Sequence, residues 1–522
     1  MNSTYFTYIK AAVAAFFLNT TSAYAQNAVY PNPGTVFDRK LHSIRILIPQ
    51  DSFNHMVSSE NIWSNHKYRA TFIYDEKDTI YNVGIRIKGN TSRSANRKSF
   101  RIDINAFEKQ TFQGLKNLNI HGNHNDPSMS REYLSAFAMN QAEVPCLRVN
   151  FVKFYINNQY FGIRANSEFI DKTFLLGRFN NDKGNLYKCT WPADLVWLGS
   201  DQNKYKEIIN NPILNERAYE LKTNETKDDY SDLVNLINVI NNSPKDSFPA
   251  RLERIFDVQM YLRTLAMEVL NGHWDNYYAN KNNYYLYNNP STGKFIYLPY
   301  DMDNTFGVQW GFSNINNRDI YNWGTSSSAA PLTKNILSHI QYRRDYEFYI
   351  KNLLQDAWHR DSLYAELDYI NQLIQFDMKN DPFFDGTFTN DYGYTFKNWQ
   401  ESYTSAWGNH VSFGIKPYIF DRSTSAVSQF KFLGIQNPVI ATPMIYPNPS
   451  KEGRIMVQIP EGFSSNNLQV QVVDWVGRLI SKHSINLNSQ SSFSFDLESV
   501  TPGNYFIRVG DFPPIPWIKL SY

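Results

Sequence analysis

The sequence is poor in cysteine, because its 522 residues contain only Cys146 and Cys189. The two are not spaced as a CxxC pair, so their spacing indicates neither a metal site nor a redox motif. An oxidising compartment would permit a bridge between them. The sequence leaves a Cys146–Cys189 disulfide and two free thiols as equal alternatives.

Long apolar runs and an excess of one charge are also missing. Beyond the N-terminal segment, no stretch approaches the roughly 20 continuous apolar residues that span a bilayer, which predicts no transmembrane anchor. The net charge is only +2, and no basic stripe of the kind that binds nucleic acid is present. Solenoid-type repeats and low-complexity tracts are absent as well. These absences argue against a membrane-spanning, a nucleic-acid-binding or a repeat protein.

The N-terminus has the three parts of a signal peptide. Lys10 provides a basic residue, and Ala11–Leu18 form a short apolar run. Ala23-Tyr24-Ala25 then supplies the small-x-small pattern that signal peptidase cleaves, which makes Gln26 the expected mature start. No cysteine follows the run to carry a lipid. We therefore expect residues 1–25 to be removed and the protein to pass through the periplasm to the cell surface or the medium.

Aromatic residues are abundant, at 16% of the chain. This excess suits an extracellular β-rich protein, and it also leaves carbohydrate binding open. From about residue 35 to 107, apolar residues alternate with polar ones, which predicts half-buried strands. Ile44, Ile46 and Ile48 follow this pattern, as do Val83, Ile85 and Ile87.

Helices and hairpins are predicted to follow. Asp126-Pro127 has the composition of a helix start, with an acidic N-cap and Pro in the first turn, and the helix would run to about Gln141. Residues 152–168 are predicted to form a hairpin. Residues 171–270 are predicted to be mostly helical, and the last of these helices is expected to end near Gly272. Beyond it we expect strands at 284–287 and 294–298, and helices over about 330–405.

The last 80 or so residues differ from the rest. They combine short alternating strands with Gly and Pro turns, the pattern of a small β-sandwich. We therefore predict an α+β chain with a large domain over 26–435, a linker over 436–442 and an Ig-like β-sandwich over 443–522.

One motif in the large domain has the spacing of a kinase catalytic loop. In His273-x-Asp275-x-x-x-x-Asn280, the aspartate would align an acceptor hydroxyl and the amide would hold a metal ion. Asp301 and Asp303 follow a buried strand, where further metal ligands would be needed. Asn280 or Asn283 would complete a set of hard oxygen ligands of the kind that Mg²⁺ binds. Each of these residues taken singly also fits an ordinary loop or capping role.

Phosphoryl transfer also needs backbone N–H groups and a lysine around the phosphates. Gly89, Asn90, Thr91 and Ser92 could supply the N–H groups. Lys98 is the preferred lysine here, and Lys88 is the second choice.

His121 and His124 raise a separate question. Together with Asp126 they would suggest a metal site, but no third ligand of the right spacing is evident. We therefore interpret both as ordinary loop histidines.

Several segments resemble the spore coat protein H (CotH-like) kinase family. The resemblance covers roughly residues 35–405, and it implies an atypical protein-kinase-like, two-lobed fold. It also implies a protein that phosphorylates Ser/Thr-rich secreted or coat proteins with ATP and a divalent metal, Mg²⁺ or Mn²⁺. The segments are Gly84-Ile85-Arg86-Ile87-Lys88-Gly89-Asn90-Thr91-Ser92 with Lys98-Ser99-Phe100, Gly272-His273-Trp274-Asp275-Asn276-Tyr277-Tyr278, Asn282-Asn283-Tyr284-Tyr285-Leu286-Tyr287, and the most specific, Pro299-Tyr300-Asp301-Met302-Asp303-Asn304-Thr305-Phe306-Gly307.

The resemblance assigns roles by position. Asp275 would be the catalytic aspartate, Asp301 a metal ligand, and Lys98 the lysine at the nucleotide phosphates. Glu168 would lie at the hinge beside the adenine, and Glu132 would pair with Lys98.

Two departures from ordinary kinases put the usual activation-loop mechanism in doubt. Trp274 stands where arginine is usual, and no Gly-x-Gly-x-x-Gly is present.

The C-terminal part resembles a type A sorting domain of the type IX secretion system. This resemblance implies transit through the outer membrane, with the secretion machinery as a partner. The segments are Tyr446-Pro447-Asn448-Pro449-Ser450, Val473-Asp474-Trp475-Val476-Gly477-Arg478, Pro502-Gly503-Asn504-Tyr505-Phe506 and the final Lys519-Leu520.

Three functions are consistent with these patterns. The first is an exported kinase that transfers the γ-phosphoryl group of ATP to Ser or Thr of a secreted or surface protein. The second is a surface adhesin or structural protein on an inactive kinase-like fold, which the scarcity of ATP outside cells favours. The third is a carbohydrate-active enzyme. A glycosidase needs two facing carboxylates and no metal, so metal dependence separates it from a kinase.

Overall fold

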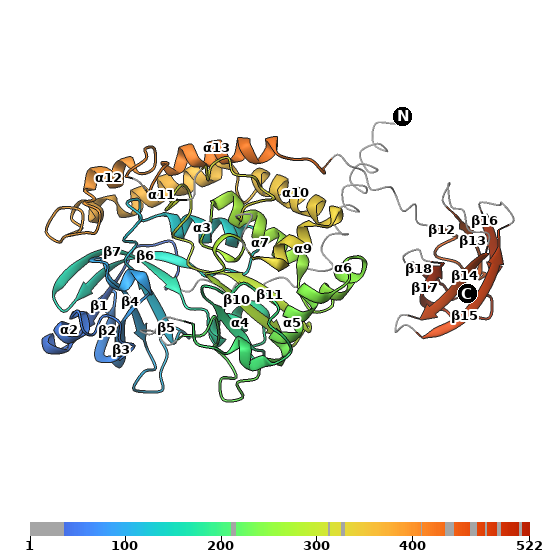
Figure 1. The fold of residues 1–522 in the computed structure, drawn as a ribbon, viewed down its shortest axis with the longest axis horizontal. Coiled ribbons are helices and arrows are strands. Elements are labelled where there is room, and N and C mark those ends of the chain that lie inside the picture. The colour runs from blue at the N-terminus through green and yellow to red at the C-terminus, as the bar shows by residue number, and fades with distance from the viewer. Residues whose placement is uncertain are drawn as a thin grey trace. The chain divides into compact units, whose positions relative to one another are not determined.

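The computed structural model describes residues 36–209, 216–311, 314–324, 329–408, 410–433, 443–459, 467–474, 478–487, 492–510 and 514–521. They form two compact units that divide between Phe432 and Leu433 (Figure 1). The predicted signal peptide and the predicted linker over 436–442 lie outside the described residues.

The N-terminal part of the first unit is a closed barrel with strand order β1-β2-β3-β4-β5-β7-β6. Neighbouring strands are antiparallel, except that β1 pairs with β6 in parallel. The alternating Ile44, Ile46, Ile85 and Ile87 fill the barrel core, as their spacing predicts. The strands are β1 (His42–Leu47), β2 (Tyr68–Tyr74), β3 (Asp78–Lys88), β4 (Ser99–Asp103), β5 (Asn117–His121), β6 (Val149–Ile156) and β7 (Gln159–Glu168), with helix α2 (Gln50–Val57) and the short helix η1 (Thr91–Arg93) between them.

Helix α3 (Arg131–Gln141) begins later than the Asp126-Pro127 signal predicts. The Asp126 carboxylate accepts hydrogen bonds from the backbone N–H groups of Ser128 at 2.9 Å and Arg131 at 3.0 Å, but these bonds lie in a turn that precedes the helix. Met129 has φ 60°, a left-handed conformation that a right-handed helix cannot include. The predicted helix start was therefore wrong, and the predicted end was right.

The second part of this unit combines helices with an antiparallel sheet of order β11-β10-β8-β9. The expectation that residues 171–270 are mostly helical missed β8 and β9, which are too short to show a clear alternation. Helix α7 ends at Gly272 with φ 76°, as predicted. The elements are α4 (Lys172–Phe179), β8 (Leu186–Cys189), η2 (Gln202–Tyr205), β9 (Tyr219–Leu221), α5 (Ser231–Asn242), η3 (Lys245–Ser247), α6 (Phe248–Leu252), α7 (Val258–Asn271), α8 (Tyr277–Asn280), β10 (Tyr284–Asn289) and β11 (Lys294–Pro299).

The later helices cover one side of the unit (Figure 1). They are α9 (Pro331–Leu337), α10 (Ile340–Gln355), α11 (Arg360–Lys379), α12 (Phe396–Glu401) and α13 (Ile415–Ser428). Helix α11 packs against β7, α3 and α13, which joins the helices to the barrel. Among the described residues, no helix is both long and apolar enough to cross a membrane. Cys146 and Cys189 are buried free thiols, so the disulfide alternative is not realised.

The second unit consists of two sheets with orders β12-β13-β16 and β15-β14-β17-β18. Both sheets contribute to one apolar core that includes Val457, Val472 and Trp517. This arrangement fits the predicted Ig-like β-sandwich. The strands are β12 (Met444–Tyr446), β13 (Arg454–Gln458), β14 (Asn467–Asp474), β15 (Leu479–Asn486), β16 (Ser492–Asp496), β17 (Gly503–Val509) and β18 (Ile515–Lys519).

Candidate active site

A cavity of about 1080 Å³ lies in the first unit. One wall comes from barrel strands β3, β4 and β5 and the loop that starts at Gly89. The opposite wall comes from the segments that follow α7 and β11, which carry Asp275 and Asp301. The cavity therefore brings together residues from both parts of the unit.

Asp275 is held at this cavity by three asparagine side chains. Its carboxylate accepts hydrogen bonds from Nδ2 of Asn280 at 2.6 Å, Asn283 at 2.9 Å and Asn282 at 3.2 Å. Burial raises the pKa of Asp275, although the bond from Asn280 opposes the rise. The amide oxygens of Asn280 and Asn283 are not used in these contacts.

Asp301 and Asp303 follow directly after β11 and line the same cavity. Burial raises the pKa of Asp303 well above its ordinary value, and the nearby carboxylates of Asp301, Glu132 and Asp275 raise it further. Such crowding of carboxylates in a partly buried site is unfavourable unless a cation compensates it. The carboxylate and amide oxygens present here therefore fit a hard divalent cation such as Mg²⁺ or Mn²⁺.

Lys88 reaches the cavity from the end of β3. Its Nζ contacts Nε2 of His121, and Nδ1 of the same ring lies 2.9 Å from Oε2 of Glu132. Burial lowers the pKa of Lys88, while the charges of Asp301 and Glu132 act to raise it. Lys88, His121 and Glu132 thus form a chain of contacts across β3, β5 and α3.

Lys98, the lysine preferred from the sequence, has a different place. Its Nζ donates to the backbone carbonyls of Arg93 at 3.1 Å and Ala95 at 3.0 Å. It is not among the described residues that line the cavity. The expected Lys98–Glu132 pair is wrong, because Glu132 is bonded to His121 and to the hydroxyl of Ser167.

The loop of Gly89, Asn90 and Ser92 does line the cavity, as the sequence predicts. Gly89 has φ 105°, and a Cβ at this position would lie 2.2 Å from Oγ of Ser92, so only glycine fits. Arg93, which also lines the cavity, fixes the loop, because its Nε donates to the carbonyl of Gly89 at 2.7 Å and its Nη1 to that of Ser64 at 2.9 Å. Nothing in the sequence distinguishes Arg93 from an exposed loop arginine, so its role in supporting the loop was not predicted.

Glu168 does not face the cavity, which is lined instead by its neighbour Phe169. Its carboxylate is paired with Arg178 at 2.6 Å and Arg148 at 2.7 Å. Burial acts to raise the pKa of Glu168, but the two arginines outweigh it and the pKa lies below its ordinary value. The side chain holds α4 to the barrel and is not free to contact a nucleotide base.

His121 and His124 do not come together with Asp126 in the structure. Asp126 is buried with Arg131, so the considered set of His121, His124 and Asp126 is not formed. Instead, His121, Glu132 and Asp301 each offer one ligand atom within 4.8 Å of the others. These residues lie on three distant segments, and no sequence spacing could have revealed the group. His121 itself is the last residue of β5 and not a loop residue, and its two ring nitrogens contact Lys88 and Glu132.

The fold and the cavity define a mixed α and β protein in which basic and acidic groups from two parts of one unit converge. Its family follows from comparison of sequences. The profile of the CotH kinase protein family matches residues 85–413, and the chain belongs to this family.

Three relatives illustrate how far the similarity extends. The chain is 25% identical over 299 residues to the inner spore coat protein H of Bacillus subtilis (strain 168), covering 57% of this chain and 78% of that protein. It is 23% identical over 344 residues to the invasin CotH2 of Rhizopus delemar, and 22% identical over 341 residues to the invasin CotH3. Each of these matches covers 60% of this chain and 54% of the invasin, so the chain spans about half of their length.

Residues 444–512 match the secretion system C-terminal sorting domain. This domain confirms the resemblance found in the sequence and implies interaction with the type IX secretion machinery. The chain is therefore exported, to the cell surface or to the medium.

Proposed function

We propose that this chain is an exported protein kinase that transfers the γ-phosphoryl group of ATP to Ser or Thr of a secreted or surface protein. The carrying observation is that Lys88 and the Gly89 loop share one cavity with Asp275, Asp301 and Asp303. The first unit has two clusters of buried apolar residues, one inside the barrel and one mostly in the helical part, which supports the proposed two-lobed, kinase-like fold.

The phosphate end of the nucleotide would lie against Lys88 and the backbone N–H groups of residues 89–92. These groups are fixed before the substrate arrives, by the bond from Arg93 to the Gly89 carbonyl and by His121 beside Lys88. Donors held in place in this way stabilise charge on the transferred group more effectively than water does. Asp301 and Asp303, with the amide oxygens of Asn280 and Asn283, would hold Mg²⁺ or Mn²⁺, which supplies neutralisation of phosphate charge.

Asp275 would accept the proton of the acceptor hydroxyl. The three amide groups bonded to it fix the direction of its carboxylate. In the transfer, the bond between the γ-phosphorus and the bridging oxygen breaks and ADP leaves. A bond forms between that phosphorus and the acceptor oxygen, and the hydroxyl proton passes to Asp275.

The test uses the mature chain from residue 26 with ATP and either Mg²⁺ or Mn²⁺. At 100 times its dissociation constant, a ligand that binds only the folded state adds about 2.7 kcal/mol of stability. We expect metal-dependent thermal stabilisation by ATP and incorporation of labelled γ-phosphate into an exported acceptor protein. Asp275→Asn should remove the incorporation and keep the stabilisation. A chain that no nucleotide stabilises with either metal would contradict the proposal.

A second candidate is a surface adhesin on an inactive kinase-like fold. It is supported by two relatives whose names describe them as invasins. Adhesion that persists in Asp275→Asn, together with absence of nucleotide binding by the unmodified chain, would favour it. Metal-independent cleavage of a glycan would instead indicate the carbohydrate-active alternative.

A further inference from the structure

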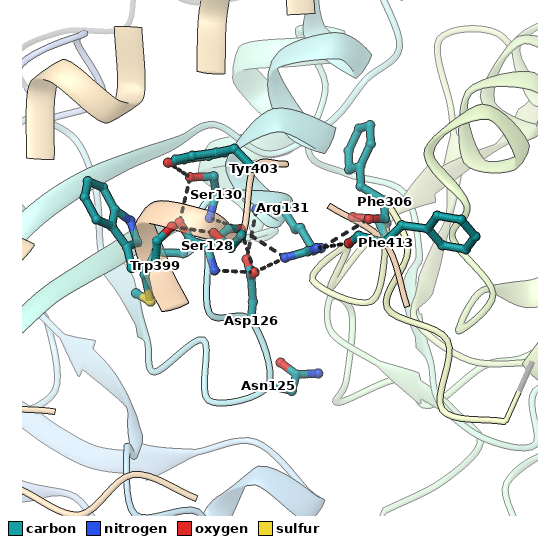
Figure 2. A network of polar contacts seen from close by, with 12 residues as sticks. Asn125, Asp126, Ser128, Ser130, Arg131, Phe306, Trp399, Tyr403 and Phe413 are labelled. Carbon is teal, nitrogen blue, oxygen red and sulfur yellow. Dashed lines mark hydrogen bonds and ion pairs between the residues drawn. The ribbon is translucent and has the colours of Figure 1, made fainter. Parts of the chain in front are cut away.

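Arg131, the first residue of α3, is fully buried and forms bonds with three separate segments. Its Nη1 pairs with the Asp126 carboxylate, its Nη2 donates to the carbonyl of Phe413 at 3.1 Å, and its Nε contacts the carbonyl of Phe306 at 3.4 Å. Figure 2 shows the guanidinium between Asp126 on one side and the two carbonyls on the other. Arg131 therefore links the start of α3 to the segment that follows β11.

Two further contacts connect the same parts of the chain. Oγ of Ser135, one turn along α3, lies 3.0 Å from Oγ1 of Thr305. Nδ2 of Asn125, which precedes α3, donates to Oδ1 of Asn304 at 2.9 Å. The contacts from residues 125–135 thus reach three consecutive residues, 304 to 306, directly after Asp301 and Asp303.

The segment held in this way has a strained backbone. Asp301 has φ 53° and Phe306 has φ 44°, and neither is glycine. L-residues adopt this left-handed region only when their surroundings hold them there, and such residues cluster at functional sites. The backbone N–H of Phe306 donates to the carbonyl of Asn271 at 2.7 Å, so the segment is held on both sides.

We propose that Arg131 and Ser135 are positioning residues that hold the segment 301–307 in the conformation that directs Asp301 and Asp303 into the cavity. The inference rests on the proposed function, in which these carboxylates bind a divalent cation. Among the residues that the structure describes, neither Arg131 nor Ser135 lines the cavity, so each acts through the segment. Glu132, next to Arg131, contacts His121 on the other wall, so one helix orients both walls.

The variant Arg131→Lys distinguishes a positioning role of the guanidinium from a simple requirement for a positive charge. An ammonium group at this position would still neutralise the buried Asp126. It would lack the planar fork whose further N–H groups reach the carbonyls of Phe306 and Phe413. Arg131→Lys should therefore keep the ion pair and release the segment.

The experiment is a titration of the mature chain with Mn²⁺, in which the free ion is followed by electron paramagnetic resonance. Changes to residues that orient metal ligands typically weaken binding about 10- to 100-fold. We expect Arg131→Lys to weaken Mn²⁺ binding about tenfold and Ser135→Ala to weaken it measurably, with unchanged circular dichroism. Arg178→Lys is the matched control, because Arg178 is also buried and bonded to a carboxylate and a carbonyl. Its Mn²⁺ affinity should equal that of the unmodified chain.

A kinetic measurement separates positioning from general destabilisation. In labelled-phosphate transfer, a high Mn²⁺ concentration should restore most of the Arg131→Lys rate, whereas a loss of folded protein would not respond. If Arg131→Lys does not fold, the Ser135→Ala titration decides. Unchanged Mn²⁺ affinity in folded variants would overturn the positioning role and leave the kinase proposal standing. Failure of the unmodified chain to bind Mn²⁺ would overturn both.

Discussion

Arginine side chains are buried at several points of this chain, and they differ in how well they are paired. Arg97 donates to the buried carboxylate of Asp381 at 2.9 Å. Arg164, equally buried, has three side-chain nitrogens without a hydrogen-bond partner among the described residues. Burial lowers the pKa of Arg164 well below its ordinary value, and Arg97 lowers it further. The buried charge of Arg164 is therefore expected to destabilise the folded state.

Replacing these two arginines should have opposite effects. Arg164→Met removes a buried charge that has no hydrogen-bond partner among the described residues and only a cation–π contact with Phe383, so we expect the free energy of unfolding to rise by about 1 to 3 kcal/mol. Arg97→Met leaves Asp381 buried without its partner, and we expect a decrease of about 3 to 5 kcal/mol. Urea unfolding followed by tryptophan fluorescence measures both. A decrease for Arg164→Met as large as that for Arg97→Met would show that Arg164 has a stabilising partner.

The two candidate lysines should also separate in activity. Lys88 faces the cavity, whereas Lys98 donates to backbone carbonyls of its own loop. We expect Lys88→Met to lower the rate of phosphoryl transfer about 100-fold or more, the usual effect of removing one preorganised donor. Lys98→Met should lower it less than tenfold. Transfer of labelled phosphate at saturating metal measures both rates. A larger loss of rate in Lys98→Met than in Lys88→Met would indicate that Lys98 is the lysine that contacts the phosphates.

The candidate site was predictable from the sequence where one short segment carries the chemistry. Asp275 with Asn280, and the Gly89 loop, were found because their spacing is local. The choice between Lys88 and Lys98 was not, because it depends on which side chain faces the cavity at the two ends of the loop. His121 and Glu132 meet Asp301 only through the tertiary fold, so no local pattern could identify that group.

Helix α4 and the end of β7 are joined by a buried charge cluster. Glu168 at the end of β7 pairs with Arg178 on α4 and with Arg148 before β6. Both pairs lie close enough for strong hydrogen bonds, and burial protects them from screening by salt. The cluster therefore fixes the direction in which the chain leaves the barrel.

The acid sensitivity of the first unit should depend on this cluster. The pKa of Glu168 is lowered in the folded state, so its stabilising contribution is present above the ordinary glutamate pKa. It is lost as pH falls through the lowered value. We expect Glu168→Gln to reduce the free energy of unfolding by about 3 kcal/mol at pH 7. The difference from the unmodified chain should shrink as the pH is lowered. Denaturant melts at a series of pH values measure it, and a pH-independent difference would contradict this account.

Secondary structure was predictable where a pattern extends over several turns or strands. The alternating isoleucines predicted β1 and β3 correctly, and the helical character expected within residues 171–270 is found in α5 and α7. The strands β8 and β9 have only four and three residues. They exist because they extend the sheet of β10 and β11, and that pairing is a tertiary effect.

At the scale of the whole molecule, none of the hydrophobic clusters of the described residues contains members of both compact units. The core of the second unit is formed within residues 443–522 from both of its sheets. Units with their own cores usually fold as separate cooperative systems.

Calorimetry of the mature chain should therefore show two transitions. A chain that ends at residue 432 should keep the transition of the first unit within a few degrees and lose the other. Calorimetry of both chains under the same conditions makes the comparison. A shift of the first transition by more than about 4 °C, which corresponds to roughly 3 kcal/mol for a unit of about 400 residues, would show that the units stabilise each other.

The barrel topology lay beyond the reach of the sequence. Alternation indicates that strands are present, but it does not state which strands pair. The closing contact joins β1 to β6 in parallel, with His42 opposite Val152. The five intervening strands of the barrel order carry no local signal for this partnership.

The closure of the barrel by β1 and β6 has a consequence for an exported protein. An open sheet exposes a row of unpaired N–H and C=O groups at each edge, to which a strand of another molecule can add. Here each of the seven strands has a neighbour on both sides, so this sheet offers no such template. The barrel is therefore protected by its own connectivity against edge-to-edge aggregation outside the cell.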